Sequence, residues 1–94
     1  MTLYTSKEIA ERYHISDKTA LKLAQQGVLK ATIFGDNALR FHLLTDDDGN
    51  PIERLYTAEE VAEQLKLNRQ TIYRLVRDGK LDAIKLSERL IRFK

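Results

Sequence analysis

Residues 57–81 read TAEEVAEQLKLNRQTIYRLVRDGKL, and this stretch decides the expected fold. Thr57 and Glu60 have the spacing of a capping box, in which the threonine oxygen accepts from the amide three residues on and the glutamate reaches back. Asn68 is a good N-cap for a second helix, which would end at Gly79, where a left-handed C-cap fits. The stretch therefore predicts two short helices joined by a tight turn.

The second of these helices has two different sides. At 100° per residue, four polar or cationic residues share one side: Gln70, Tyr73, Arg74 and Arg77. Three apolar residues fall on the other side: Ile72, Leu75 and Val76. The pattern predicts one side packed into a core and one side that offers cations and hydrogen-bond donors to an external partner.

The sequence contains an internal repeat. A shift of 52 residues aligns residues 3–42 with residues 55–94 without a gap, and 13 of the 40 aligned positions are identical. Unrelated sequences would match at roughly two or three positions. The first copy repeats the helix signals, with a capping box from Thr5 to Glu8 and an N-cap at Ser16. We therefore expect two copies of one fold.

Each copy continues in β-like alternation after its glycine, Gly27 or Gly79, and then has a polar tip and a second apolar stretch. This order predicts strands that start at Leu29 and Leu81 and form a β-hairpin. The expected fold class is α+β, mainly α: a tandem winged helix-turn-helix in which two short helices precede each hairpin wing. The first helices should bury these stripes: Ile9, Ala10 and Tyr13, and Val61, Ala62 and Leu65.

Charge is distributed unevenly along the chain. Residues 1–44 form the expected first copy, residues 45–54 an acidic turn or linker, and residues 55–94 the second copy, with net charges of +2, −3 and +3 that agree with the total of +2. The linker's DDDG lacks the ligand spacing of a calcium loop. Positive charge is therefore concentrated in the second copy.

Composition excludes several classes of protein. The chain of 94 residues has no cysteine, which rules out disulfides, thiolate zinc sites and a cysteine nucleophile. No apolar run approaches the roughly eighteen residues of a membrane span, and the N-terminus does not resemble a signal peptide. We expect a cytoplasmic, nucleoid-associated protein with no membrane contact. We expect no enzyme, no catalytic or metal-binding residues, no cofactor and no small-molecule ligand.

The second copy resembles the winged helix-turn-helix of phage excisionases and MerR-type regulators. The residues that carry the resemblance are Thr57, Glu59, Ala62, Glu63, Leu65, Thr71, Ile72, Tyr73, Arg74, Leu75, Gly79 and Leu81. Where that family usually has a glycine in the turn, this chain has His14 and Lys66, which predicts a left-handed position held at some cost in strain. The resemblance implies binding of duplex DNA.

Candidate DNA contacts in the second copy follow from side-chain chemistry. Arginine can fork onto guanine and glutamine onto adenine, which predicts base-edge contacts from Arg69, Gln70 and Arg74. We expect backbone contacts from Asn68, Thr71, Tyr73 and Arg77 on the helix. On the hairpin wing, we expect backbone or minor-groove contacts from Lys85, Arg89 and Arg92.

The first copy has a weaker candidate surface. It carries Asp17 where the second copy has Arg69, and Leu21 where the second copy has Tyr73. Two interpretations stay open: a protein-contact surface around Leu21, or looser DNA reading, which we favour. Looser reading would use base-edge contacts from Lys18 and Lys22 and backbone contacts from Thr19, Asn37 and Arg40.

The predicted function is sequence-specific binding of double-stranded DNA at two adjacent sites by two linked modules. The resemblance implies an excisionase-like recombination factor or a transcriptional regulator, with a recombinase or a second copy of the chain as protein partner. The alternative is a protein-interaction adaptor that keeps the repeat fold without DNA contact.

Overall fold

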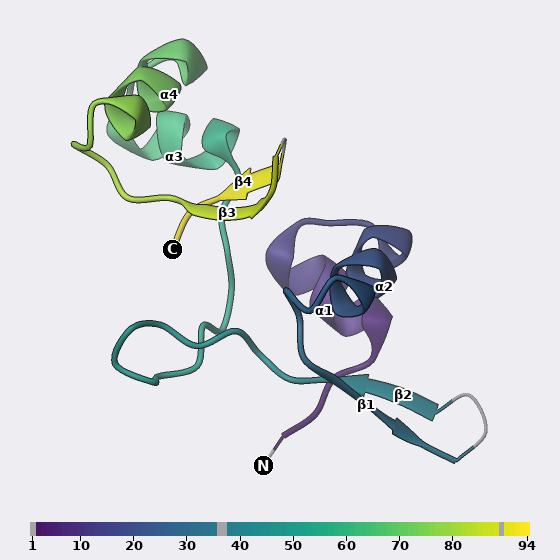
Figure 1. The fold of residues 1–94 in the computed structure, drawn as a ribbon. Helices are drawn as coiled ribbons and strands as arrows, with labels where there is room; N and C mark the ends of the chain where they lie inside the picture. Colours follow the sequence, from purple (N-terminus) through teal and green to yellow (C-terminus); the bar gives the residue numbers. More distant parts are fainter. Residues whose placement is uncertain (1, 36–37, 89) are drawn as a thin grey trace. The chain divides into compact units, whose positions relative to one another are not determined.

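The computed structural model describes residues 2–35, 38–88 and 90–94. The chain divides into two compact units, Met1–Arg54 and Leu55–Lys94, which we call the first unit and the second unit. In the described residues each unit has two helices followed by an antiparallel hairpin (Figure 1). This part of the chain is a small α+β protein, compatible with the winged helix-turn-helix fold.

The elements of the two units occur in the same order. The first unit contains α1 (Ser6–Tyr13), α2 (Asp17–Gln25), β1 (Ala31–Phe34) and β2 (Ala38–Phe41). The second unit contains α3 (Ala58–Leu65), α4 (Arg69–Arg77), β3 (Ile84–Ser87) and β4 (Leu90–Arg92). The helices of the second unit begin and end 52 residues after those of the first unit.

Local side-chain caps start the helices where the sequence predicted. In α1, the Thr5 amide donates to the Glu8 carboxylate at 2.9 Å, and the Glu8 amide donates to the Thr5 hydroxyl oxygen at 3.1 Å. Thr57 and Glu60 repeat both bonds at α3, at 2.9 and 3.2 Å. The two capping boxes are confirmed, so residues three apart in sequence are enough to fix these helix starts.

The turn between the helices uses a left-handed residue in both units. His14 has a φ of 55° and Lys66 has a φ of 59°. The next amides return to the preceding helix, with Ile15 donating to Ala10 at 3.0 Å and Leu67 donating to Ala62 at 2.9 Å. The predicted left-handed position is confirmed, and both units hold it without a glycine.

Glycine ends the second helix of each unit. Gly79 has a φ of 76°, and its amide donates to the Val76 carbonyl at 3.1 Å. The Lys80 amide donates to the Leu75 carbonyl at 2.8 Å, which completes a Schellman motif. Gly27, with a φ of 81°, ends α2 in the same way.

The hairpins begin later than the sequence predicted. Leu29 and Leu81 were expected in the first strands, but their amides donate to the Leu23 and Leu75 carbonyls at 3.2 Å. These leucines therefore extend the helix cap. β1 pairs with β2 in a regular antiparallel register, whereas the β3–β4 register shifts between Lys85 and Ser87.

The first unit has the larger buried core. The buried apolar residues of this unit are Tyr4, Ile9, Ala10, Tyr13, Ala20, Leu23, Leu29, Phe41 and Ile52. The second unit has a smaller cluster, in which Ala58, Ala62, Ile72 and Phe93 are buried and Val61 packs against them in part. The small Ala10 and Ala62 are buried on the first helices, as expected where two helices pack closely.

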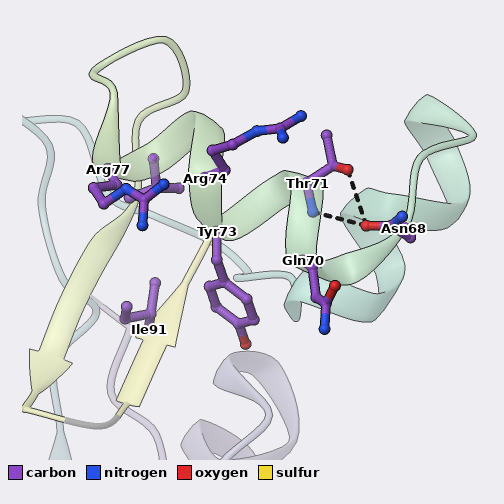
Figure 2. A pocket seen from close by; sticks show the side chains of 8 residues that line it. Asn68, Gln70, Thr71, Tyr73, Arg74, Arg77 and Ile91 are labelled. Atoms are coloured by element: carbon purple, nitrogen blue, oxygen red, sulfur yellow. Dashed lines mark hydrogen bonds between the residues drawn. The ribbon is translucent and has the colours of Figure 1, made fainter.

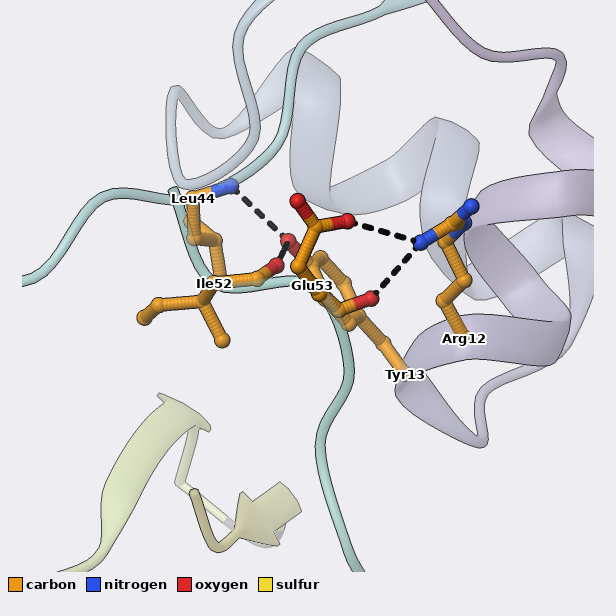
Figure 3. Close-up of polar contacts among 5 residues, drawn as sticks. All are labelled: Arg12, Tyr13, Leu44, Ile52 and Glu53. Atoms are coloured by element: carbon orange, nitrogen blue, oxygen red, sulfur yellow. Dashed lines mark hydrogen bonds and ion pairs between the residues drawn. The ribbon is translucent and has the colours of Figure 1, made fainter. Parts of the chain in front are cut away.

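The prediction that Leu65 is buried was wrong. Leu65 is 50% exposed, whereas its first-unit equivalent, Tyr13, is fully buried. The Tyr13 hydroxyl accepts from the Leu44 amide at 2.9 Å and donates to the Ile52 carbonyl at 2.8 Å (Figure 3). A segment distant in sequence therefore covers this position in the first unit, which a helical stripe alone does not reveal.

Residues 45–54 belong to the first unit and make contacts with its helix α1. The Asp46 carboxylate accepts from the amides of Asp48 and Asn50 at 2.9 Å, which forms a tight acidic turn. Beyond this turn, the Arg12 guanidinium pairs with the Glu53 carboxylate at 3.1 Å and also donates to the Glu53 carbonyl (Figure 3). These contacts place the segment with α1.

Candidate nucleic-acid interface

The N-cap of α4 fixes the polar start of the candidate helix. The Asn68 side-chain oxygen accepts from the Thr71 amide at 2.8 Å and from the Thr71 hydroxyl at 2.9 Å (Figure 2). The cap therefore uses the Asn68 oxygen and leaves its NH2 group as the donor that points away from the helix. A helix N-terminus with outward donors favours phosphate oxygens.

The side of α4 predicted to face a partner is exposed. Gln70, Tyr73, Arg74 and Arg77 are all exposed, while Ile72 on the opposite side is fully buried. An open depression of about 660 Å³ runs between this side and β4 (Figure 2). The residues that line it are Asn68, Gln70, Thr71, Tyr73, Arg74, Val76, Arg77 and Ile91. The structure thus brings six of the proposed contact residues together around one open surface.

Arg69 differs from the other arginines of α4 because it has an ionic partner on α3. Its guanidinium donates to the Glu59 carboxylate at 2.7 Å, and both side chains are about three-fifths exposed. This hydrogen bond is the main cause that lowers the pKa of the Glu59 carboxyl, and it also raises the pKa of Arg69. DNA contact by Arg69 would have to compete with a solvent-screened ion pair.

Arg77 is held more loosely. Its Nε lies 4.0 Å from the Asp78 carboxylate, at the limit of an ion pair, and its side chain is 77% exposed. Such a pair contributes little in water and is easily exchanged for a phosphate. Arg77 is therefore available at the C-terminal end of the depression.

The hairpin of the second unit contributes cations of two kinds. Lys85 is exposed on β3. Arg92 on β4 is partly buried, and its guanidinium donates to the Ile91 carbonyl at 2.8 Å. The proposed contact at Arg89 lies outside the described residues. Lys85 extends the cationic surface beyond α4, whereas Arg92 also braces its own strand.

The corresponding surface of the first unit is less cationic. Lys18 and Lys22 are exposed on α2, while Thr19 takes part in the helix cap by accepting from the Ser16 hydroxyl at 2.8 Å. Arg40 is partly buried and donates to the Leu39 carbonyl at 2.8 Å. Asn37 lies outside the described residues. The first unit therefore offers two exposed lysines on its second helix.

A depression of about 470 Å³ lies beside α2, and half of its lining residues are aliphatic. The lining residues are Thr5, Ser6, Leu21, Ile33, Leu39 and Arg40. The sequence interpretation identified Leu21 but missed the exposed apolar pair Ile33 and Phe34. The signal was available, because two adjacent apolar residues at the end of a strand point to opposite faces, and a two-stranded hairpin does not cover both.

Neither a cluster of metal-ligating side chains nor a membrane-spanning helix occurs in the described residues. These residues contain no group of three or more histidine, cysteine, aspartate or glutamate residues placed to hold a metal ion. In the same part of the chain, no helix has the length and apolar character required to cross a membrane.

Comparison with known families finds one similarity. Residues 55–94, which are 40 of the 94 residues, match the family described as Helix-turn-helix domain. No curated protein and no solved structure matches the chain significantly. The matched residues coincide with the second unit, which carries the exposed cationic side of α4. Domains of this family are typically non-enzymatic. The match supports a helix-turn-helix domain of the DNA-binding kind at residues 55–94.

Proposed function

We propose that the chain binds duplex DNA sequence-specifically and that the second unit supplies the principal contacts. The observation that carries this proposal is the exposed side of α4, where Gln70, Arg74 and Arg77 line one open depression with Tyr73. A B-DNA major groove is about 12 Å wide and admits one helix. An exposed recognition helix flanked by a cationic hairpin suits that groove.

The contacts divide by chemistry. Arg74 and Gln70 carry bidentate groups suited to base edges, and Arg69 joins them when it leaves Glu59. Phosphate contacts come from the helix residues Asn68, Thr71, Tyr73 and Arg77 and from the wing residues Lys85, Arg89 and Arg92. The base-edge contacts therefore set sequence preference, and the phosphate contacts set affinity.

The first unit takes a secondary part in this proposal. Its exposed Lys18 and Lys22 contact DNA loosely, with Thr19, Asn37 and Arg40 near the phosphate backbone. The shared order of elements and the 52-residue offset support a tandem duplication of one module. Two linked modules would bind adjacent sites, with affinity raised by their effective concentration. Such a factor would serve as an excisionase-like recombination factor or as a transcriptional regulator.

Selection of bound duplexes from a random pool by the full chain tests the proposal. Two double variants then compare the units. Arg74→Ala with Arg77→Ala removes two positive charges from α4, and Lys18→Ala with Lys22→Ala removes two from α2. We expect an enriched sequence motif and a far larger loss of affinity from the arginine pair. An unenriched pool, or equal losses from the two variants, would contradict the proposal.

A protein-interaction adaptor is the second candidate, and one observation favours it. Ile33 and Phe34 are exposed at the end of β1 in the first unit. Neighbouring exposed apolar side chains would suit contact with a partner protein that covers them. An adaptor without DNA contact would enrich no duplex in the same selection, so one experiment separates the two functions.

A further inference from the structure

The outer edge of β1 has backbone groups with no partner in the described part of the chain. On its inner side β1 pairs with β2, and the other side of β2 is bridged by Tyr4 through two bonds with Phe41, at 2.9 and 2.7 Å. The His42 amide donates to the Lys30 carbonyl, so the backbone groups of Lys30 face β2. Successive residues of an antiparallel strand point their N–H and C=O groups to alternate sides of the strand. The N–H and C=O groups of Ala31 and Ile33 therefore face outward.

The side chains at this edge are neutral and largely exposed. β1 consists of Ala31, Thr32, Ile33 and Phe34, with no charged residue. Ile33 is 71% exposed and Phe34 is 51% exposed. A neutral apolar edge strand with outward backbone groups is a template for pairing with another strand.

The equivalent edge of the second unit is protected. By the 52-residue offset, Lys85 of β3 is equivalent to Ile33 of β1, and Lys85 is exposed. The β3–β4 register also shifts between Lys85 and Ser87. A lysine and a bulge are two of the devices by which proteins block pairing at an edge. The first unit has neither device, although its hairpin follows the same pair of helices.

We propose that β1 pairs with β1 of a second copy of this chain, antiparallel across a two-fold axis, to form a four-stranded sheet. A second copy is the fitting occupant because two identical edges meet antiparallel under two-fold symmetry and each supplies the donors and acceptors that the other lacks. The neutral strand brings no like charges together, whereas paired β3 edges would bring two copies of Lys85 close. The new bonds engage the amides of Ala31 and Ile33, and the contact covers Ile33 and Phe34.

The interface is small, because only one short strand from each copy forms it. Interfaces of this size belong to weak and transient associations. The dimer therefore forms at high protein concentration in free solution and is favoured where two chains are held close together. It does not depend on DNA binding, so the two proposals succeed or fail separately.

Sedimentation equilibrium of the full chain without DNA, from about 10 µM to about 1 mM, tests the dimer. We expect a reversible monomer–dimer equilibrium. Ile33→Lys gives β1 the residue that protects β3, and should weaken dimerisation by roughly tenfold or more. Leu65→Lys is the matched control, since it places the same charge at a half-exposed leucine of α3, outside β1, and should leave the equilibrium unchanged.

Amide hydrogen exchange locates the contact. Protection of the Ala31 and Ile33 amides should rise with protein concentration, while the exposed position of Ile33 allows Ile33→Lys to keep the helical circular dichroism of the parent chain. A monomer at every concentration would overturn the proposal. A dimer that Leu65→Lys weakens as much as Ile33→Lys, or one that leaves both amides unprotected, would overturn it as well.

Discussion

The two units have the same secondary structure and present different surfaces. In the second unit, the exposed side of the second helix carries Tyr73, Arg74 and Arg77. The equivalent side chains of the first unit are Leu21, Lys22 and Gln25. The depression beside the helix changes accordingly: its lining includes Arg74 and Arg77 in the second unit, and Leu21, Ile33 and Leu39 with the single Arg40 in the first unit.

The difference teaches that the fold and the binding surface depend on separate sets of residues. Thr5 and Thr57 cap the first helices in the same way, and Phe41 and Phe93 are both buried near the ends of the hairpins. These positions specify helices and core in both units. The exposed positions are free to differ, so one unit can carry a cationic surface while the other carries an apolar edge.

Substitution of equivalent residues on α4 and α2 should give the largest difference in DNA affinity between the two units. Arg74→Ala should weaken binding to the selected duplex by about 1–3 kcal/mol and relax its sequence preference, because Arg74 lies at the centre of the exposed side. Lys22→Ala, at the equivalent position, should weaken binding much less. Fluorescence anisotropy measures both, and equal losses would remove the distinction between the units.

Tyr13→Phe should destabilise the first unit by about 2 kcal/mol, because it leaves the Leu44 amide and the Ile52 carbonyl without the hydroxyl that joins them. Residue-resolved hydrogen exchange measures the effect. Exchange in the second unit serves as the internal control, since Leu65 stands at the equivalent position. Unchanged exchange of the first unit would show that the segment is not held by this hydroxyl.

The same residue predicts a pH dependence confined to the first unit. Burial raises the pKa of the Tyr13 hydroxyl above its ordinary value of 10.0. A raised pKa in the folded state means that the stabilisation is fully present below pH 10 and is lost as pH rises through the raised pKa. Tyr13→Phe should abolish that part of the alkaline loss, which denaturant titrations at several pH values can detect. An identical alkaline loss in the variant would exclude Tyr13 as its source.

Valine in place of the capping glycine should affect both units alike. Gly79→Val should cost about 1–2 kcal/mol, because a φ of 76° is unfavourable for a side chain, although the space around a Cβ atom is open. Gly27→Val, at a φ of 81°, should cost a similar amount in the first unit. Thermal unfolding measures both, and an unchanged melting temperature would refute the cap assignment.

The smallest effect is expected at the ion pair that is specific to the second unit. Glu59→Gln should free Arg69 and tighten DNA binding a few-fold, since the carboxylate no longer competes with DNA. Glu63→Gln removes the same charge from another exposed position of α3, and is the matched control. If both variants tighten binding equally, net charge explains the effect and Arg69 has no special part in it.

The sequence predicted what depends on local chemistry. Helix starts at Thr5 and Thr57 and helix ends at Gly27 and Gly79 follow from residues a few positions apart. Leu65 was misjudged because burial at that position depends on a segment 31 to 39 residues further along the chain, as contacts of Tyr13 in the first unit show.

The candidate surface was also predicted only where it depends on residues close together in the sequence. The exposed side of α4 follows from helical periodicity, which places Arg74 and Arg77 opposite the buried Ile72. The pairing of Arg69 with Glu59 crosses a turn between two helices, and the exposure of Ile33 depends on the absence of a third layer over a short hairpin. Helical periodicity does not reveal the ion pair, whereas the adjacent apolar residues Ile33 and Phe34 in a two-stranded hairpin did carry a signal for exposure that the sequence interpretation did not use.

The salt dependence of duplex binding tests the central claim most directly, namely that the cations of the second unit hold DNA phosphates. With about six phosphate contacts, affinity should fall on the order of a thousandfold between about 50 and 200 mM salt. Arg77→Ala should reduce the slope of log affinity against log salt by about one. Duplex binding that is absent, insensitive to salt, or unchanged in slope by Arg77→Ala would contradict the account.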